Sequence, residues 1–299
     1  MRNINLLLTA IIILLLGSVG LYWFMNNPDL GNQYNKTNTD NGLNTEEVLP
    51  VELDGGIGDG AGPLEEQIPD GEPHVIGQSA GGSDIIAYHF GSGSKEVLLI
   101  GGIHGGFAPG TVTVMENYVD SLKKENSLPS DLRLTIIPLL NPDSLNKGTG
   151  LAGRLNNNNV DLNRNFGCNW KEEGVWRQQS VSGGKEAFSE PEAKALRNYI
   201  DNNRPTAVVA YYAASGGVYV SACDGIVNEE ASNLVDVYAN ASGYKANKTF
   251  DSYVTNGDLT NWLAKENIPA ISVLLTNYTN PELAKNLKGI EAVLMEIAK

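Results

Sequence analysis

The chain has 299 residues, with 35 Asp and Glu against 21 Lys and Arg, so its formal net charge is −14. Hydrophobic residues make up 41% of it and charged residues 19%, which is ordinary for a globular protein and excludes a wholly disordered chain. The acidic balance offers no surface that could displace counterions from phosphates, so we expect no nucleic-acid partner, and two cysteines exclude a disulfide-rich scaffold and an all-cysteine zinc site.

The first 25 residues predict a membrane anchor. Residues 6–25 are an uncharged, mostly apolar run of twenty residues, which is long enough to cross a bilayer as a helix. Because no small-residue cleavage site follows, the run favours an uncleaved signal anchor over a cleaved signal peptide. Arg2 on the short N-terminal side predicts a single-pass protein of the cell membrane whose C-terminal domain lies outside the cytoplasm. A cleaved signal would instead make that domain a secreted protein.

Residues 26–70 predict an acidic, flexible linker. The segment holds ten Asp and Glu against one lysine, Lys36, and is rich in Asn and Gly. Such a composition buries too little apolar area to order itself, and like charges extend it. The acidity of the chain is therefore largely a property of this linker, and residues 71–299 remain as one domain.

From residue 73 onward the chain alternates strand and helix patterns. Residues 96–102 form a continuous apolar run that ends in glycines, which is typical of a buried central strand. Ser189, two residues before Pro191, is the expected N-cap of a helix. The other patterns predict strands at 75–79, 84–90, 132–138, 206–212 and 270–275, and helices at 111–125, 190–203, 228–241, 258–266 and 281–298. This alternation predicts an α/β sandwich around a mixed, largely parallel sheet, with ligands bound at the carboxyl edge of the strands.

Several segments of this domain carry a family resemblance. They are residues 101–106 (Gly-Gly-Ile-His-Gly-Gly), 141–143 (Asn-Pro-Asp), 153–154 (Gly-Arg), 160–166 (Val-Asp-Leu-Asn-Arg-Asn-Phe), 208–217, 268–275, and the pair Tyr253 and Trp262. In this order they resemble the zinc metallocarboxypeptidase (carboxypeptidase A-like) family, in particular its bacterial extracellular branch, over about residues 73–298. The resemblance implies a three-layer α/β/α sandwich with a mixed, mostly parallel sheet of about eight strands.

The resemblance also implies a zinc site, and this chain departs from it. The family holds zinc with a His, a Glu three or four residues later and a second, distant His, and uses a late Glu as the general base. His104 matches the first ligand, but Phe107 and Ala108 occupy the positions expected for the Glu. Tyr212 takes the place of the second His, and Leu274 takes the place of the base. No catalytic residue is therefore expected to be intact.

The substrate-binding positions that the resemblance implies are retained. Arg154 matches the arginine that polarises the scissile carbonyl, while Asn163 and Arg164 match the pair that holds the C-terminal carboxylate of the substrate. Tyr253 matches the tyrosine that covers the bound residue. An alternative interpretation is that Asp161, Asn163 and Arg164 are kept only as a buried polar network of the loop.

These observations predict a membrane-tethered pseudopeptidase that binds peptide C-termini or cell-wall stem peptides and needs no cofactor. One alternative is an active zinc metallocarboxypeptidase with a non-standard ligand set, which would need zinc and would release C-terminal amino acids. A second alternative is a structural or adhesion module. Cys168 and Cys223 either form a disulfide or remain free thiols, and both states are compatible with the sequence.

Overall fold

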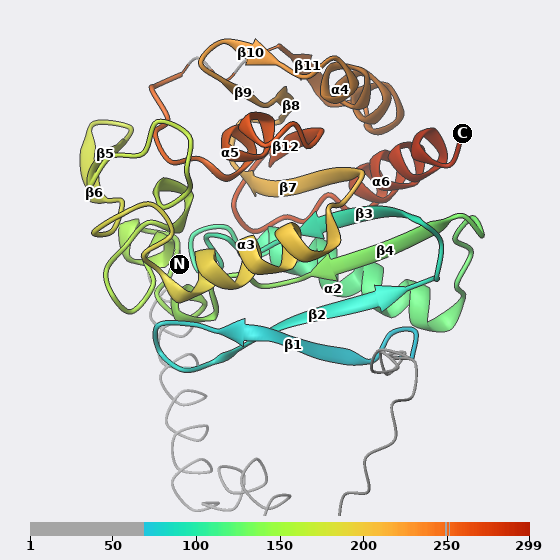
Figure 1. Cartoon of the computed structure of the whole chain (residues 1–299), viewed down its shortest axis with the longest axis horizontal. Helices are drawn as coiled ribbons and strands as arrows, with labels where there is room; N and C mark the ends of the chain where they lie inside the picture. Colours follow the sequence, from blue (N-terminus) through green and yellow to red (C-terminus); the bar gives the residue numbers. More distant parts are fainter. Residues whose placement is uncertain (1–68, 249, 251) are drawn as a thin grey trace, which may run out of the picture. The chain divides into compact units, whose positions relative to one another are not determined.

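A mixed sheet of eight strands forms the centre of the fold (Figure 1). The computed structural model describes residues 69–299, except residues 249 and 251. The strands follow the order β1-β2-β4-β3-β7-β12-β8-β11 across the sheet. The four parallel pairings are β3 with β4, β3 with β7, β7 with β12, and β8 with β11, and the other three pairings are antiparallel. The predicted mixed eight-stranded sheet is thus confirmed.

The secondary-structure elements have the following bounds. The strands are β1 (Pro73–Gln78), β2 (Asp84–Phe90), β3 (Lys95–Ile100), β4 (Leu132–Ile137), β5 (Glu173–Trp176), β6 (Gln179–Ser182), β7 (Ala207–Ala213), β8 (Gly217–Val220), β9 (Ala222–Cys223), β10 (Ile226–Val227), β11 (Lys245–Asn247) and β12 (Ala270–Leu275). The α-helices are α2 (Pro109–Lys124), α3 (Pro191–Asn203), α4 (Glu229–Ser242), α5 (Leu259–Lys265) and α6 (Leu283–Ile297). Short 3₁₀ helices are η2 (Pro142–Ser144), η3 (Leu151–Arg154) and η4 (Leu162–Arg164).

The central strands are buried on both faces because their sequences are mostly apolar. In β3, five consecutive residues from Glu96 to Ile100 are buried, and in β7 the six residues from Ala207 to Tyr212 are buried. Leu98 lies between Thr135 of β4 and Val208 of β7, and all three strands run in the same direction. Their carboxyl ends therefore meet at one edge of the sheet, where the site described below is located.

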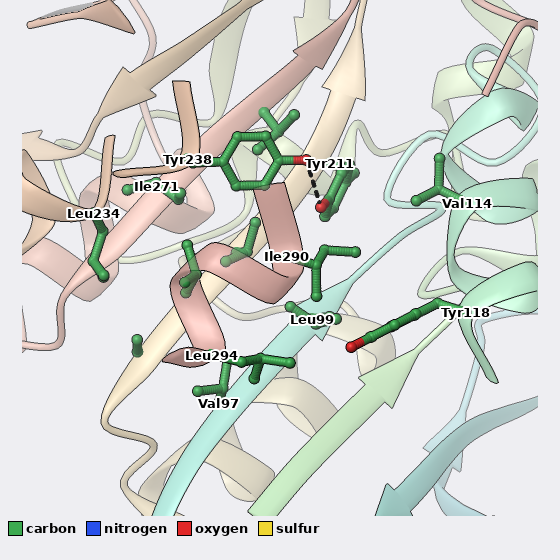
Figure 2. Close-up of a cluster of buried hydrophobic side chains, with 14 of the residues drawn as sticks. Val97, Leu99, Val114, Tyr118, Tyr211, Leu234, Tyr238, Ile271, Ile290 and Leu294 are labelled. Atoms are coloured by element: carbon green, nitrogen blue, oxygen red, sulfur yellow. Dashed lines mark hydrogen bonds between the residues drawn. The ribbon is translucent and has the colours of Figure 1, made fainter. Parts of the chain in front are cut away.

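Helices cover both faces of the sheet, which gives three layers. Figure 2 shows the core on one face, where side chains from α2, α4 and α6 meet β3, β7 and β12 and the hydroxyls of Tyr211 and Tyr238 are 2.9 Å apart. The core of the opposite face combines the same strands with α3 and α5, through residues such as Leu196, Ile200 and Trp262. Each helix contributes an apolar face to one core and leaves its polar face to solvent.

Some predicted details differ from the structure. Ser189 is not the N-cap of α3: Glu190 takes that position, and the Ser189 hydroxyl instead donates a hydrogen bond to the Glu190 carboxylate over 2.8 Å. Strands β8 and β11 and the hairpins β5–β6 and β9–β10 were not predicted from the sequence. All are two to four residues long, and such short segments show too few alternations to reveal a period.

The predicted membrane anchor at residues 1–25 and most of the predicted linker lie outside the described residues. Within residues 69–299, apart from the two exceptions named above, no helix combines the length and apolarity that crossing a membrane requires. The described residues belong to one compact unit, Glu65–Lys299.

Candidate functional site

A cavity opens at the carboxyl edge of the sheet, with an empty volume of about 820 Å³ that includes solvent space at its mouth. Strands β7 and β12 supply Tyr212 and Leu274, while the loop after β3 supplies His104. The residues that line it are His104, Arg154, Asn163, Arg164, Tyr212, Ala213, Tyr219, Val220, Ala222, Phe250, Tyr253, Thr255, Asp258, Thr260, Asn261, Ser272 and Leu274. The structure thus brings seven of the predicted positions together on one cavity lining. The other two, Phe107 and Ala108, pack in an aromatic cluster beside them.

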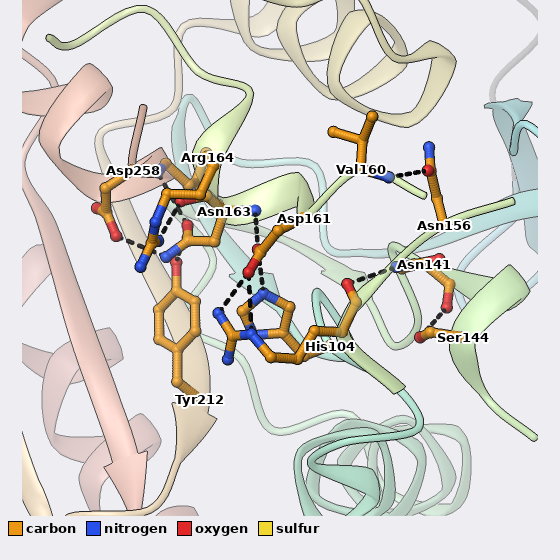
Figure 3. Close-up of polar contacts among 12 residues, drawn as sticks. His104, Asn141, Ser144, Asn156, Val160, Asp161, Asn163, Arg164, Tyr212 and Asp258 are labelled. Atoms are coloured by element: carbon orange, nitrogen blue, oxygen red, sulfur yellow. Dashed lines mark hydrogen bonds and ion pairs between the residues drawn. The ribbon is translucent and has the colours of Figure 1, made fainter. Parts of the chain in front are cut away.

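His104 and Arg154 share one buried carboxylate, that of Asp161. The His104 Nε2 atom lies 2.8 Å from Asp161 Oδ1 (Figure 3), and Arg154 donates from Nε and Nη2 to Asp161 Oδ2 over 2.9 and 2.8 Å. All three side chains are at most 5% exposed. The charge of Arg154 is therefore compensated inside the protein.

This arrangement determines the protonation of the three groups. Burial, reinforced by the charge of Arg154, lowers the pKa of His104 to about 4. Burial also opposes ionisation of Asp161, but Arg154 and His104 outweigh it and hold the pKa of Asp161 well below its ordinary value. At neutral pH we therefore expect a neutral His104 that donates a hydrogen bond from Nε2–H to an ionised Asp161, which is paired with Arg154.

An aromatic cluster occupies the space beside His104. The Phe107 ring lies edge-on to the His104 ring at 6.3 Å, and it contacts Trp176 at 5.2 Å and Tyr278 at 4.7 Å between ring centroids. The guanidinium of Arg154 lies 5.2 Å from the Phe107 ring and 4.8 Å from the Trp176 ring. These contacts favour Phe107 over Ala108 as the residue in the place of the missing glutamate.

Tyr212 and Leu274 are neighbours in the register of β7 and β12. The Tyr212 hydroxyl donates to Asn163 Oδ1 over 3.2 Å. Burial, followed by the charge of Asp258, raises the pKa of Tyr212 well above 10, so the phenol is neutral. Leu274 has no atom that could bind a metal or accept a proton.

The donor set at these positions does not fit a catalytic zinc ion. Such an ion takes three protein ligands from His, Cys, Asp or Glu, whereas His104 is accompanied here by Phe107 and a neutral Tyr212. Across the described part of the chain, no group of three or more His, Cys, Asp or Glu side chains is placed to hold a metal ion.

The Asn163 side chain is engaged by its neighbours. Its Nδ2 donates to Asp258 Oδ2 over 2.6 Å, and its Oδ1 accepts from the Leu259 backbone N–H as well as from Tyr212. With Asp161, these contacts form the buried polar network that the alternative interpretation of this loop expects. One Nδ2 proton of Asn163 is left for a further partner.

Arg164 is the member of this network whose charge has no partner. Arg164 is 1% exposed, and its guanidinium donates only to backbone carbonyls, from Nε and Nη2 to Val175 and from Nη1 to Asn163. None of the described carboxylates forms an ion pair with it, although it lines the cavity. The Tyr253 ring lies 5.9 Å from the guanidinium. A buried guanidinium on a cavity lining, without an ion-pair partner among the described residues, can bind an anion.

Two features of the site escaped the sequence analysis, and a third was left open by it. Asp258 was predicted only as the first residue of a helix, and it is indeed the N-cap of α5, but it also lines the cavity. Trp176 lies in a hairpin that was not predicted. Cys168 and Cys223, left open above, form a disulfide. Their positions after loops that carry site residues were the available signal.

The chain matches the model of the zinc carboxypeptidase family over residues 63–287. Murein peptide amidase A of Escherichia coli (strain K12) is 34% identical to it over 155 residues, which cover 48% of this chain and 60% of that protein. Murein peptide amidase A of Escherichia coli O157:H7 gives the same values. The chain thus spans about 60% of the length of the curated relatives it matches.

Solved structures share this fold. Murein-tripeptide amidase from Escherichia coli O157 aligns with a TM-score of 0.57 at 23% identity, over 76% of this chain and 92% of that chain. Bovine thrombin-activatable fibrinolysis inhibitor aligns with a TM-score of 0.63 at 17% identity, over 76% and 90% of the two chains. Carboxypeptidase A from Helicoverpa armigera aligns with a TM-score of 0.63 at 19% identity, over 76% and 68%.

Proposed function

The chain belongs to the zinc carboxypeptidase family, and on this premise we propose that it is a catalytically degenerate member that binds the free C-terminus of a peptide without hydrolysing it. The peptide is a stem peptide of the cell wall. The domain is held outside the cytoplasm by a membrane anchor within residues 1–25.

The observation that carries this proposal is the environment of Arg164. A buried guanidinium without an opposite charge is costly unless a ligand supplies that charge. The planar fork of arginine matches a carboxylate in a bidentate arrangement. The terminal carboxylate of a peptide is such an anion. It enters the open cavity, while the preceding residues of the peptide remain outside.

The replaced positions support loss of hydrolysis. Hydrolysis in this family requires a metal-bound water and a base, and the aromatic ring of Phe107, the neutral phenol of Tyr212 and the aliphatic Leu274 supply neither. A module with a purely structural role is expected to fill its former cleft with side chains. Here Tyr212 and Leu274 are adjacent but still line an open cavity.

The choice of a cell-wall peptide rests on the relatives. The curated relatives at 34% identity and one structural neighbour are named as murein peptide amidases. An extracytoplasmic domain would meet stem peptides, and a long acidic linker would let it reach them from the membrane.

Peptide binding by Arg164 is tested by calorimetry on the purified full chain. We expect a short peptide with a free C-terminal carboxylate to bind, and its C-terminal amide to bind much more weakly. Arg164→Met should weaken binding of the free acid by roughly 10- to 100-fold, because charge-assisted hydrogen bonds contribute about 1.5–3 kcal/mol. Arg164→Lys should restore only part of the affinity, since an ammonium cannot bind bidentately.

Arg177→Met is the matched control, because Arg177 is an exposed arginine in the turn between β5 and β6 and lies outside the cavity lining. It should bind as the wild type does. Equal binding of acid and amide by the folded wild-type protein would refute the proposal, as would release of a C-terminal amino acid that a chelator abolishes.

A further inference from the structure

Two buried carboxylates lie together at the start of α3, outside the cavity lining. Glu190 is 4% exposed and Glu192 is fully buried. Asn156 joins them, because its Nδ2 donates to Glu190 Oε2 over 2.7 Å and to Glu192 Oε2 over 3.1 Å. Neither carboxylate belongs to an ion pair with a cationic side chain of the described residues. The two acidic groups thus share one amide without a cation between them.

The surroundings of this pair do not compensate two negative charges. The N-terminus of α3 carries only about half a positive charge. Asp143 of η2 adds a third carboxylate, whose hydrogen bonds come from neutral donors. The ammonium of Lys147 donates to the Asn157 side chain and to two backbone carbonyls. From the β1–β2 turn, the Ala80 N–H donates to Glu192 Oε1 over 3.0 Å.

This arrangement favours retention of a proton. Two ionised carboxylates on one buried amide repel each other, and burial disfavours both charges. Burial raises the pKa of Glu192, and the charge of Asp143 acts in the same direction, although hydrogen bonds from Ala80 and Asn156 oppose it in part. The pair should therefore keep one proton at a pH at which an exposed glutamate has already lost its own.

The pair also holds the turn that precedes Asp161. Asn156 Oδ1 accepts from the backbone N–H of Val160 over 3.0 Å (Figure 3) and from that of Asn158 over 3.0 Å. The Asn158 side chain donates to Glu190 Oε2 over 2.8 Å. The amide that shapes this turn is thus the same amide that the two carboxylates bind.

A second connection leads from Glu190 to Arg164. Asn165 directly follows Arg164, and its Oδ1 accepts from the Glu190 N–H over 3.0 Å. Its Nδ2 donates to the Ser189 hydroxyl over 3.0 Å, and this hydroxyl donates to Glu190 Oε1 over 2.8 Å. The loop that carries Asp161 and Arg164 is therefore bound to the acidic pair on both sides.

We propose that Glu190, Glu192 and Asn156 form a proton-dependent latch on the loop that carries Arg164. The latch is closed while Glu192 carries a proton, and it loosens when both carboxylates are ionised. Binding of a peptide carboxylate at Arg164 therefore weakens as the pH rises. This regulation rests on the proposed function, whereas the latch itself does not.

The latch predicts the sign of a pH effect on stability. The contribution of Glu192 to the free energy of unfolding is fully present below the ordinary pKa of 4.5 and is lost as the pH rises through the higher pKa of the folded state. Urea unfolding of the full chain at several pH values above 4.5 measures this loss. Glu192→Gln cannot ionise, so its free energy of unfolding should fall less with rising pH than that of the wild type. The comparison cancels the contribution of His104, which both proteins share.

Glu230→Gln is the matched control, because Glu230 is also the second residue of its helix, α4, but is exposed. It should show the pH dependence of the wild type. Asp143→Asn removes the third carboxylate and should shift the loss of stability to lower pH, which a purely structural role of Glu192 does not predict. Equal pH dependence of the wild type and folded Glu192→Gln would overturn the latch.

Infrared spectroscopy observes the proton directly and does not require Glu192→Gln to fold. In the wild type we expect a carboxylic acid that loses its proton only above pH 4.5, and in Asp143→Asn the same band should disappear at a lower pH. A spectrum without such a band, or a band that Asp143→Asn leaves unmoved, would also overturn the latch.

Calorimetry tests the regulation, with the peptide Ala-Ala-Ala as the free acid and as the C-terminal amide. The affinity of the wild type for the acid should fall several-fold over the pH range in which the latch opens, while Glu192→Gln should keep its affinity there. If the latch titrates but both proteins bind the acid equally at every pH, the regulation is overturned. If acid and amide bind alike, the proposed function is refuted, and the unfolding and infrared measurements still decide on the latch.

Discussion

At the residue scale, His104 shows how a buried network sets a protonation state. Metal-binding histidines commonly donate their second ring nitrogen to a carboxylate, and His104 retains such a partner in Asp161. The guanidinium of Arg154 pairs with the other oxygen of the same carboxylate and provides a positive charge there. The network is complete without a ligand, which explains why Arg164, and not Arg154, is the open cation of the site.

The low pKa of His104 predicts a pH dependence of stability. The ordinary pKa of histidine is 6.5, and the pKa of His104 in the folded protein is about 4. Between pH 6.5 and pH 4 the unfolded chain therefore binds more protons than the folded chain does. The free energy of unfolding should therefore fall as the pH falls through this window, by up to about 3 kcal/mol from this group. Urea unfolding of the wild type and of His104→Gln, which keeps a donor for Asp161, measures the difference. The exposed His74→Gln should retain the wild-type slope, and an identical slope in His104→Gln would contradict the prediction.

At the scale of elements, the disulfide joins two walls of the cavity. Cys168 follows the loop that carries Arg164, while Cys223 lies in β9 beside the cavity residue Ala222. Gly257 ties the same loop to the segment before α5, because its N–H donates to the Cys168 carbonyl and its carbonyl accepts from the Phe166 N–H. A Cβ at this glycine would lie 2.2 Å from the Arg164 carbonyl oxygen, so no side chain fits there.

Removal of the disulfide should therefore affect both stability and binding. It closes a loop of 55 residues, for which the chain-entropy account gives about 4 kcal/mol, and native disulfides typically contribute 2–5 kcal/mol. We expect the Cys168→Ala, Cys223→Ala double variant to melt several degrees lower and to bind the free-acid peptide less tightly. The Cys168→Ser, Cys223→Ser double variant is the comparison. If it melts lower than the double alanine variant, the difference is due to the buried hydroxyl groups. A melting temperature equal to that of the wild type would contradict the prediction.

At the scale of the whole molecule, the fold is that of a zinc enzyme while the donor set is not. We expect elemental analysis of the full chain, purified with zinc supplied, to find close to zero zinc per chain. Phe107→Glu combined with Tyr212→His adds a carboxylate and a second imidazole to His104, which completes a set of three zinc ligands, and this variant should approach one zinc per chain. About one zinc per wild-type chain would contradict the ligand assignment. A folded double variant without zinc would show that the aromatic cluster of Phe107, Trp176 and Tyr278 has also changed the shape of the cleft.

Sequence patterns predicted the long, buried elements well. Strands β3, β4, β7 and β12 and helices α2 to α6 begin and end within about two residues of the predicted ranges, because continuous apolar runs and helical spacing reflect burial directly. Strand β8 escaped prediction because four residues beginning with glycine have little strand preference of their own. It is stabilised by antiparallel pairing with β12, which lies about fifty residues later.

The sequence by itself determined the family and the mixed sheet, and it predicts the replacement of the zinc and base positions, since all of these depend on residue identity at fixed spacing along the chain. Only the tertiary structure decided which charges are paired. Arg154 and Arg164 are ten residues apart and equivalent as sequence, but one meets Asp161 and the other meets only carbonyls. Asp258 reaches Asn163 across 95 residues. Such contacts arise from the folding of distant segments against one another, and local spacing carries no information about them.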